Sequence, residues 1–306
     1  MYNVPSQTGK TVVVTGSNSG TGKEAARKLA GAGAHVIMAV RSLEKGERAR
    51  DEILAAIPGA QIDVRRLDLA DLTSVKEFAD SMLAHHQELN LLVNNAGVMA
   101  PPKRFLSADG VELQLATNFL GPFALTLRLL PLLLATPASR VTTMSSNAAA
   151  MGTIRFNDIQ HTRRYVPYLT YAQSKLADLL FAQQLAVVAG QRRWDLVSNA
   201  AHPGFTRTNL LLAGTSLGKK QPRPSWMTRI MFLPSQGVEP GTEPLLVAST
   251  SPDALAGSYY GPSRLFGMVG PAALVRPPRS ARNLTTAKRL WDVAEQLSGV
   301  ALPASL

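Results

Sequence analysis

The stretch TVVVTGSNSGTG, residues 11–22, decides the fold expected of this chain. Its first five residues are all β-branched, which favours a strand, and an apolar-periodic helical pattern follows from residue 25. Between the two lie Gly16, Gly20 and Gly22 in the spacing G-x-x-x-G-x-G, which is not that of a P-loop. Glycines at a strand-to-helix turn let the backbone approach a pyrophosphate, and the helix N-terminus adds free N–H donors. The stretch therefore predicts a dinucleotide-binding turn, with an ordinary glycine-rich turn as the alternative.

Five further short runs of β-branched or aliphatic residues follow, separated by longer stretches with helical spacing. They span residues 35–40, 61–66, 91–94, 140–144 and 196–200. Apolar runs of this length suit strands that are covered on both faces, and strand-helix alternation implies right-handed crossovers. The alternation is not interrupted by a linker. We therefore expect an α/β fold with a single Rossmann-like, doubly wound parallel sheet and helices on both faces, in one domain over residues 1–306.

Two later segments depart from this alternation. Residues 209–236 are rich in glycine and proline and carry large apolar side chains such as Trp226 and Phe232. A long irregular segment of this kind is expected to be a substrate lid after the sixth strand, or a surface excursion that packs its own apolar residues. Residues 261–306 are expected to form a C-terminal extension, which is irregular up to residue 282 and helical over 281–298.

Composition and charge exclude several classes of protein. The chain of 306 residues has no cysteine, which excludes disulfide frameworks and thiolate metal sites. The five histidines show no metal-binding spacing, so no metal is expected. The net charge is +11, but the basic residues are dispersed, and no zinc-finger or RNA-reading signature is present. We expect a soluble basic surface, with attraction of an anionic cofactor or substrate as the alternative, and no specific nucleic-acid partner.

The sequence also predicts that the protein does not span a membrane. Residues 1–10 lack the apolar core of a secretory signal. The most apolar stretch, residues 124–135, is interrupted by Arg128 and Pro131 and is too short to cross a bilayer. A soluble, cytoplasmic protein is therefore expected.

The end of the second predicted strand indicates which nicotinamide cofactor this fold would hold. In a dinucleotide-binding fold an acid at this place holds the 2′-hydroxyl of NAD, whereas an arginine attracts the 2′-phosphate of NADP. The residue is Arg41, and the nearest acid, Glu44, lies three residues further on. We therefore expect NADP(H), with NAD(H) as the alternative.

Tyr171 and Lys175 open a strongly helical run, four residues apart. Side chains at positions i and i+4 share one face of a helix, so the phenol and the ammonium group face one another. A nearby cation stabilises a phenolate and can lower the pKa of the phenol by about 1–3 units. Such a pair suits a proton donor or acceptor that works near neutral pH. Alone, the pair is more typical of a helix surface.

The pair does not stand alone, because other motifs accompany it in a characteristic order. In order and rough spacing they resemble the short-chain dehydrogenase/reductase family over about residues 10–260, and they are most similar to its retinol-dehydrogenase-like branch. The motifs are residues 15–22, Asp68-Leu69, Asn94-Asn95-Ala96-Gly97, Asn118, Ser145-Ser146 and Pro203-Gly204 with Thr208.

This resemblance implies catalytic roles. Tyr171 would be the general acid in carbonyl reduction, and Lys175 would hold the nicotinamide ribose and lower the pKa of Tyr171. Ser146 would donate a hydrogen bond to the substrate carbonyl oxygen, with Ser145 as its rival. Asn118 would lie at a helix irregularity and hold a water molecule that relays protons to Lys175.

The resemblance also implies a cofactor site. Asp68 would contact adenine, Ala96 and Gly97 would pass close to the adenine ribose, and Asn95 would support the central strand. The segment from Pro203 onward would fix the carboxamide. The full expected cofactor-binding set is Gly16, Ser17, Asn18, Ser19, Gly20, Thr21, Gly22, Arg41, Asp68, Leu69, Asn95, Ala96, Gly97, Tyr171, Lys175, Pro203, Gly204, Thr206 and Thr208.

A few positions depart from the family pattern or stay open. After Asn118 the branch usually has two histidines, where this chain has Phe119 and Pro122, and the proline predicts a kink. Between Ser146 and Tyr171 the aromatic residues Phe156, Tyr165 and Tyr168 are expected either to line the pocket or simply to pack. Asp178 is expected to be a surface residue of its helix and not part of a proton relay.

The sequence thus predicts an NADP(H)-dependent oxidoreductase that moves hydride between nicotinamide and a carbonyl or alcohol. Reduction of a lipophilic aldehyde or ketone is the expected direction. The alternative is a catalytically inactive dinucleotide-binding sensor or scaffold. The expected partner is a small-molecule substrate, and the chain is expected to be a monomer or a homo-oligomer.

Overall fold

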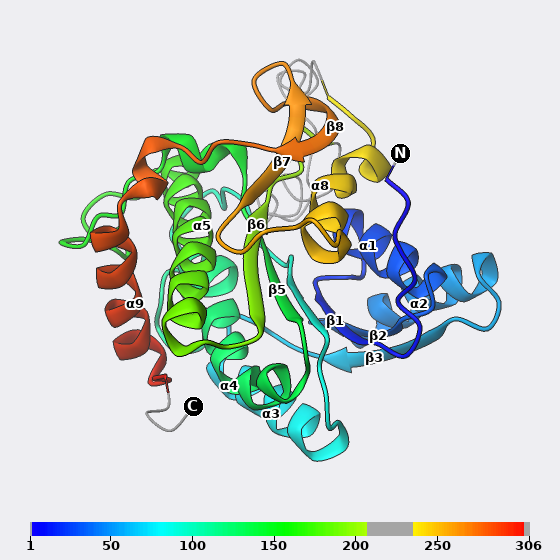
Figure 1. Cartoon of the computed structure of the whole chain (residues 1–306). Helices are drawn as coiled ribbons and strands as arrows, with labels where there is room; N and C mark the ends of the chain where they lie inside the picture. Colours follow the sequence, from blue (N-terminus) through cyan, green and yellow to red (C-terminus); the bar gives the residue numbers. More distant parts are fainter. Residues whose placement is uncertain (1, 207–234, 303–306) are drawn as a thin grey trace.

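An eight-stranded sheet forms the centre of the computed structural model, which describes residues 2–206 and 235–302 (Figure 1). The strand order is β3-β2-β1-β4-β5-β6-β7-β8, and every neighbouring pair is parallel except β7 and β8. This arrangement confirms the predicted Rossmann-like, doubly wound fold. The strands are β1 (Thr11–Thr15), β2 (His35–Val40), β3 (Gln61–Arg66), β4 (Leu91–Asn94), β5 (Ser139–Met144), β6 (Leu196–Ala201), β7 (Tyr259–Arg264) and β8 (Val269–Leu274).

Helices cover the sheet on both faces. Short helical turns η1 (Leu115–Leu120, a π-helix), η2 (Asn147–Met151) and η3 (Arg279–Arg282) supplement them. The α-helices of the described residues are α1 (Gly20–Gly31), α2 (Leu43–Ala56), α3 (Leu72–His85), α4 (Gly121–Ala135), α5 (Pro167–Arg192), α8 (Val238–Thr250) and α9 (Leu284–Ser298). Figure 1 shows α4, α5 and α9 on one side of the sheet and α1, α2 and α8 on the other.

The alternation of side chains along β1 explains the two layers. Val13 packs into a core with α3, α4, α5 and α9, whereas Val12 and Val14 pack into a second core with α1, α2 and α8. Successive strand residues point to opposite faces, so a strand that is apolar throughout needs cover on both. This is why the apolar run of residues 11–15 predicts the buried centre of the sheet.

The last two strands correct the prediction of an irregular segment up to residue 282. β7 and β8 form an antiparallel hairpin at the edge of the sheet. Glycine and proline within both strands, such as Gly261 and Pro262, weaken the strand pattern in the sequence. Gly261 has a packing reason, because a Cβ there would lie 1.8 Å from Nε2 of His202. The predicted helix over residues 281–298 is confirmed by η3 and α9.

One helical stretch of the described residues, Leu115–Ala135, is long and apolar enough to cross a membrane. It comprises η1 and α4, and 78% of its most apolar part is buried inside the protein. It therefore has the burial of a core helix. Pro122, for which the sequence predicts a kink, lies in the first turn of α4, directly after the π-helical turn.

Helix α9 packs against α5 and α4 through Trp291. The ring centroid of Trp291 lies 5.0 Å from that of Phe123 on α4 and 6.0 Å from that of Phe181 on α5. The C-terminal extension thus covers helices that hold part of the site described below.

We expect Trp291→Ala to lower the free energy of unfolding by about 3 kcal/mol, because it leaves a cavity among these rings. Urea unfolding followed by circular dichroism measures the change. The neighbouring exposed Asp292→Ala serves as the control and should change the unfolding midpoint little. A loss below about 1 kcal/mol for Trp291→Ala would show that the described packing of α9 contributes little to stability.

Candidate active site

Three neighbouring strands of the sheet end beside one another at the edge where predicted site residues lie. Asn95 follows β4, Ser145 and Ser146 follow β5, and Pro203 lies just beyond β6. β1 and β4 are parallel neighbours although two strands intervene in sequence, so the order in which the strands are added to the sheet reverses between them. Open α/β sheets bind their ligands at the carboxyl ends of strands beside such a switch.

The glycine turn packs tightly against the loop after β4. Gly16 has a φ of +65°, and a Cβ there would lie 2.8 Å from Cα of Ala96. The Thr15 hydroxyl accepts hydrogen bonds from the backbone N–H groups of Asn95 and Ala96, both at 3.0 Å. The side chain of Ser19, the N-cap of α1, makes no capping bond, and the first turn has no acid. The donors at this helix end therefore suit an anion such as a pyrophosphate.

Thr21 and Asn95 connect the glycine turn to β4 in a way that the sequence does not reveal. The Thr21 hydroxyl donates to Oδ1 of Asn95 at 2.9 Å, and the Asn95 amide donates to the carbonyl of Thr15 at 2.9 Å. A Cβ on Gly22 would lie 2.4 Å from the same Asn95 amide nitrogen. The hydroxyl at position 21 thus gives this turn a polar contact that an aliphatic side chain could not make.

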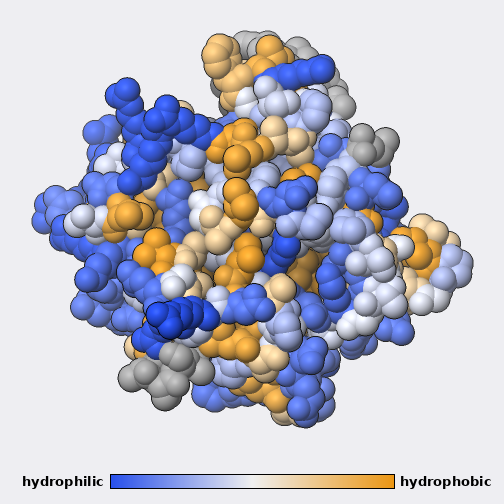
Figure 2. Space-filling model, in the orientation of Figure 1, coloured by the Kyte–Doolittle hydropathy of each residue, from blue (hydrophilic) through white to orange (hydrophobic). Residues whose placement is uncertain are grey.

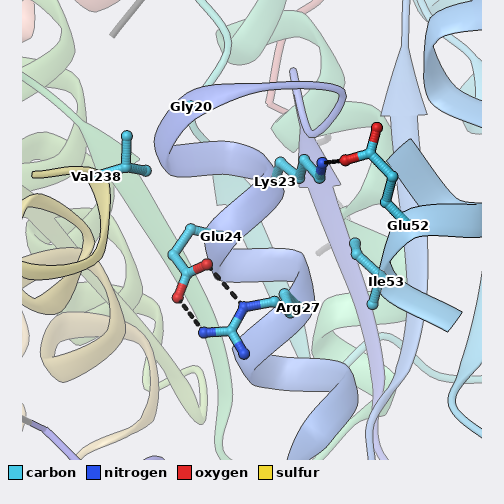
Figure 3. Close-up of a pocket in the computed structure, with 7 residues that line it drawn as sticks. All are labelled: Gly20, Lys23, Glu24, Arg27, Glu52, Ile53 and Val238. Carbon is cyan, nitrogen blue, oxygen red and sulfur yellow. Dashed lines mark hydrogen bonds and ion pairs between the residues drawn. The ribbon is translucent and has the colours of Figure 1, made fainter. Parts of the chain in front are cut away.

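A hollow of about 360 Å³ lies beside the start of α1 (Figure 3). Lys23 pairs with Glu52 across it, and Arg27 pairs with Glu24 along α1. Of the predicted site residues, Gly20 alone lines it; the full lining is Gly20, Lys23, Glu24, Arg27, Glu52, Ile53 and Val238. This hollow is therefore separate from the predicted catalytic residues.

The other predicted cofactor residues lie along the same strand ends. Arg41 is exposed directly after β2. Asp68 is half-buried after β3, and its carboxylate accepts from the backbone N–H of Ala70 at 3.0 Å. Ser17 is buried and donates to the carbonyl of Val14. Leu69 is buried against Gly121 at the start of α4.

The loop after β6 is held by its own hydrogen bonds. The carbonyl of Pro203 accepts from the Thr206 hydroxyl at 2.5 Å and from the Gln236 amide at 3.0 Å. Gly204 has a φ of +62°, and a Cβ there would lie 2.3 Å from the carbonyl oxygen of Met268. Thr208 and the predicted lid, apart from its last two residues, lie outside the described residues.

Tyr171, Lys175 and Ser146 come together where α5 passes the end of β5. The side-chain hydroxyl of Ser146 lies near enough to the Tyr171 phenol to influence its pKa. Lys175 donates from Nζ to the carbonyl of Met144 at 2.9 Å. The Ser145 hydroxyl instead donates to the backbone carbonyl of Lys175 at 2.7 Å. Of the two serines, Ser146 is therefore the one whose hydroxyl faces the phenol.

The electrostatics of Tyr171 differ from the expectation of a lowered pKa. Burial raises the pKa of Tyr171 above its ordinary value, although the Lys175 ammonium and the nearby Ser146 hydroxyl act in the opposite direction. The ammonium thus has the expected sign, but desolvation of the buried phenol outweighs it. At neutral pH the phenol holds its proton.

Asn118 lies in the π-helical turn η1, which matches the helix irregularity implied by the resemblance. Its Oδ1 accepts from the backbone N–H of Val98 at 2.7 Å. Its amide donates to the carbonyl of Val98 at 3.0 Å and to the Ser174 hydroxyl at 2.8 Å. A Cβ on Gly97 would lie 3.1 Å from Asn118 Oδ1 and 3.6 Å from Lys175 Nζ, so these groups border one space.

Asp178 contradicts the prediction that it is a surface residue. Its side chain is 1% exposed, and its Oδ2 accepts a hydrogen bond from Lys175 Nζ at 2.8 Å. Residues on every side of α5 are buried around this position, so helical spacing does not identify an outer face. The sequence reasoning therefore missed an ionised partner of the lysine.

Other side chains complete the surroundings of Tyr171. Met99, which the sequence did not single out, packs against the cluster of Ala148, Tyr171 and Ala172. The ring centroid of Tyr168 lies 6.2 Å from that of Tyr171. Tyr165 instead donates its hydroxyl to the carbonyl of Pro101 at 3.0 Å, and Phe156 lies beneath Arg289, so these two pack elsewhere. Within the described ranges, no group of three or more His, Asp or Glu residues could hold a metal ion.

The surface is hydrophilic in many places and not in one stripe. Figure 2 shows hydrophilic residues spread over one face, with smaller apolar areas between them. The exposed pairs Arg163-Arg164 and Arg192-Arg193 lie at opposite ends of α5, a helix of 26 residues and thus about 39 Å long. These charges are therefore dispersed, as the sequence indicates.

Comparison with known proteins agrees with this geometry. The family model for short chain dehydrogenases matches residues 10–215. Retinol dehydrogenase 12 of Bos taurus is 38% identical over 294 residues, which cover 95% of this chain and 87% of that protein. The resemblance noted from the motifs is thereby confirmed.

Solved structures lead to the same family. An uncharacterised protein from Mycobacterium paratuberculosis is 40% identical with a TM-score of 0.79, covering 98% of this chain and 97% of the other. A protein from Beutenbergia cavernae, described as an NAD(P)-dependent gluconate 5-dehydrogenase and solved with NADP, is 26% identical with a TM-score of 0.62, covering 83% and 95%. The chain therefore belongs to the short-chain dehydrogenase family of oxidoreductases, in its retinol-dehydrogenase-like branch.

Proposed function

We propose that this protein is an NADP(H)-dependent oxidoreductase that reduces a lipophilic aldehyde or ketone to the alcohol. The observation that carries the proposal is the buried Tyr171 phenol, which lies beside the Ser146 hydroxyl and one helical turn from the Lys175 ammonium. The set lies at the carboxyl ends of the strands, where this fold binds its ligands.

The residues of the chain supply the proton and the positioning for this reaction. The nicotinamide cofactor, when bound, supplies hydride chemistry at the carbonyl carbon. Ser146 donates a hydrogen bond to the carbonyl oxygen, and Tyr171 donates the proton that turns the developing alkoxide into a hydroxyl. Lys175 stabilises the phenolate that remains. Asn118 and Gly97 border the Lys175 ammonium, which is where a proton relay to the lysine would pass.

The glycine turn suits the cofactor. The uncapped start of α1 offers backbone donors to a pyrophosphate, and Gly16 keeps the backbone free of a side chain where the turn meets Ala96. Arg41 is exposed at the place that faces the adenosine ribose in this fold, which favours NADP over NAD. The NADP carried by the Beutenbergia cavernae relative is consistent with this preference.

Two observations support a lipophilic substrate. Met99 and the ring of Tyr168 lie against Tyr171 and offer apolar surface beside the reacting group. The bovine relative of 38% identity is named for retinol.

A screen of aldehydes and ketones, followed by NADPH absorbance, tests the proposal. Turnover that rises along a series of aldehydes of increasing chain length supports both the reaction and the substrate class. NADPH binding without turnover of any carbonyl compound or alcohol would instead indicate the inactive sensor or scaffold.

We expect Arg41→Asp to shift the ratio of NADP to NAD affinity toward NAD by about tenfold to a hundredfold, since it removes a charged hydrogen bond to the 2′-phosphate. Titration of each cofactor by fluorescence measures the ratio. Arg48→Asp, on the exposed face of α2, is the matched control and should leave the ratio unchanged. An unchanged ratio in Arg41→Asp would remove this residue from cofactor selection.

A further inference from the structure

Lys175 has a buried counter-ion that the proposed reaction does not by itself require. Nζ of Lys175 and Oδ2 of Asp178 are 2.8 Å apart, and their side chains are 3% and 1% exposed. The residues lie three apart on α5, so the pair is built into one helical turn. Because both groups have left water, each charge depends on the other for its stability.

The second carboxylate oxygen marks Asp178 as more than a packing residue. Oδ1 is buried, and it has no hydrogen-bond partner among the described residues. Buried polar atoms are normally satisfied, and an apolar side chain of similar size would avoid this cost. Burying a carboxylate at this position is therefore unfavourable. Its presence is explained if it acts on the charges of Lys175 and Tyr171.

The effect follows from the sum of buried charges. With the phenol protonated, the ammonium and the carboxylate sum to zero, and ionisation of Tyr171 would leave one net negative charge in the protein interior. Without the carboxylate, ionisation of the phenol would instead remove the net positive charge of the ammonium. In a medium of low dielectric constant, an uncompensated charge is strongly disfavoured.

We propose that Asp178 is a positioning residue that holds the Lys175 ammonium and offsets its charge, so that Tyr171 keeps its proton at neutral pH and the site is set to donate that proton. This inference rests on the proposed function and adds to it a preference for reduction over oxidation.

The other titratable groups near this pair do not carry a competing charge at neutral pH. From β7, Tyr259 donates its hydroxyl to the backbone carbonyl of Ser146 at 3.3 Å, and burial raises the pKa of Tyr259. Beside it, the His202 ring lies tilted against that of Tyr259 with ring centroids 5.0 Å apart, and burial lowers the pKa of His202 to about 4. On α5 itself, burial raises the pKa of Tyr168.

The protonation states of the pair agree with the proposal at pH 7. Burial raises the pKa of Asp178 to about 6, although Lys175 opposes the rise, so the carboxylate is mostly ionised at pH 7. Burial acts to lower the pKa of Lys175, but Asp178 and Tyr171 together outweigh it and the pKa is raised overall.

The test compares the pH dependence of both reaction directions in the full chain and in Asp178→Asn. Reduction needs the protonated phenol and fails above its pKa, whereas oxidation needs the phenolate and rises there. In Asp178→Asn we expect the fall of the reduction rate and the rise of the oxidation rate to move to lower pH by about one pH unit. Oxidation at neutral pH should rise about tenfold relative to reduction.

Three controls separate charge from structure. Asp178→Glu keeps the charge and should show the wild-type pH dependence in both reaction directions. Asp292→Asn removes the same charge from the exposed side of α9 and should also show it. Asp178→Ser removes the buried charge with a smaller side chain, and it replaces Asp178→Asn in the test if that variant does not fold by circular dichroism.

A second readout needs neither substrate nor cofactor. The phenolate ultraviolet absorbance of Tyr171 is obtained by subtracting the titration of a variant that also carries Tyr171→Phe. Ionisation of Tyr171 at lower pH in Asp178→Asn supports the proposal. The proposal is overturned if the two pH profiles or the ionisation of Tyr171 stay at the wild-type pH or move to higher pH. Absence of all turnover in the wild-type protein would reject the proposed function alone, because this titration would still decide the role of Asp178.

Discussion

Tyr171→Phe is expected to lower kcat for carbonyl reduction by a factor of about 10²–10⁴ and to change NADPH affinity little. The variant keeps the ring, which belongs to an apolar cluster with Ala148 and Ala172, and removes the hydroxyl that lies beside Ser146. A loss confined to kcat is typical of a group that acts in the chemical step and not in binding. Steady-state kinetics with the best substrate of the carbonyl screen, together with NADPH titration, measure the two effects.

Tyr165→Phe is the matched control for this prediction. Its side chain is half-buried, and its hydroxyl donates to the carbonyl of Pro101 at 3.0 Å instead of lying beside Lys175. This variant should lose about 1 kcal/mol of stability and keep its turnover at temperatures where it is folded. If Tyr171→Phe and Tyr165→Phe kept equal turnover, the proton would come from another donor and the proposed mechanism would fail.

The sequence predicts the first six strands because their signal is local. Residues 11–15 and 35–40 are mostly apolar on both faces, and the structure places them as adjacent buried strands inside the sheet. The glycine motif adds a constraint that depends on backbone geometry, as the positive φ of Gly16 shows. Such signals need no knowledge of distant contacts.

The hairpin of β7 and β8 lacks a local signal of this kind. Its strands contain glycine and proline, which break the pattern of alternating or continuous apolar residues. Gly261 is explained by a contact with His202, nearly sixty residues earlier in the chain. A preference that arises from such a distant contact cannot be read from a window of neighbouring residues.

The candidate site shows the same division. The motifs identify Ser145 and Ser146 as a pair. The choice between them depends on which hydroxyl donates to the backbone carbonyl of Lys175. Asp178 could not be identified for a related reason. Most of α5 around it is buried, so its polar residues do not mark a solvent-exposed face. Residue types and spacing thus predict which groups are present, whereas their pairing requires the packed helix.

Lys175→Met is expected to abolish most turnover and to destabilise the protein by about 3–5 kcal/mol at alkaline pH. Removal of the ammonium leaves the Asp178 carboxylate buried without a counter-ion, since the two side chains are 3% and 1% exposed. An exposed ion pair gives the contrast. Lys76 and Asp80 pair on the surface of α3, and Lys76→Met should change stability little.

The pH dependence of this loss of stability distinguishes a buried charge without a counter-ion from a simple cavity. Without Lys175, burial holds the pKa of Asp178 in the folded variant even further above its unfolded value, so the folded state binds this proton more tightly than the unfolded chain does. Stability gained in this way is fully present below the unfolded pKa of about 4 and is lost as pH rises through the folded pKa. Urea unfolding should therefore show a smaller loss at pH 5 than at pH 8.

The double variant Lys175→Met/Asp178→Asn should recover much of the stability at pH 8, without turnover, and should remove the pH dependence. An equal loss at both pH values in Lys175→Met would mean that the carboxylate finds another partner, and that Lys175 and Asp178 are not energetically coupled as their contact implies.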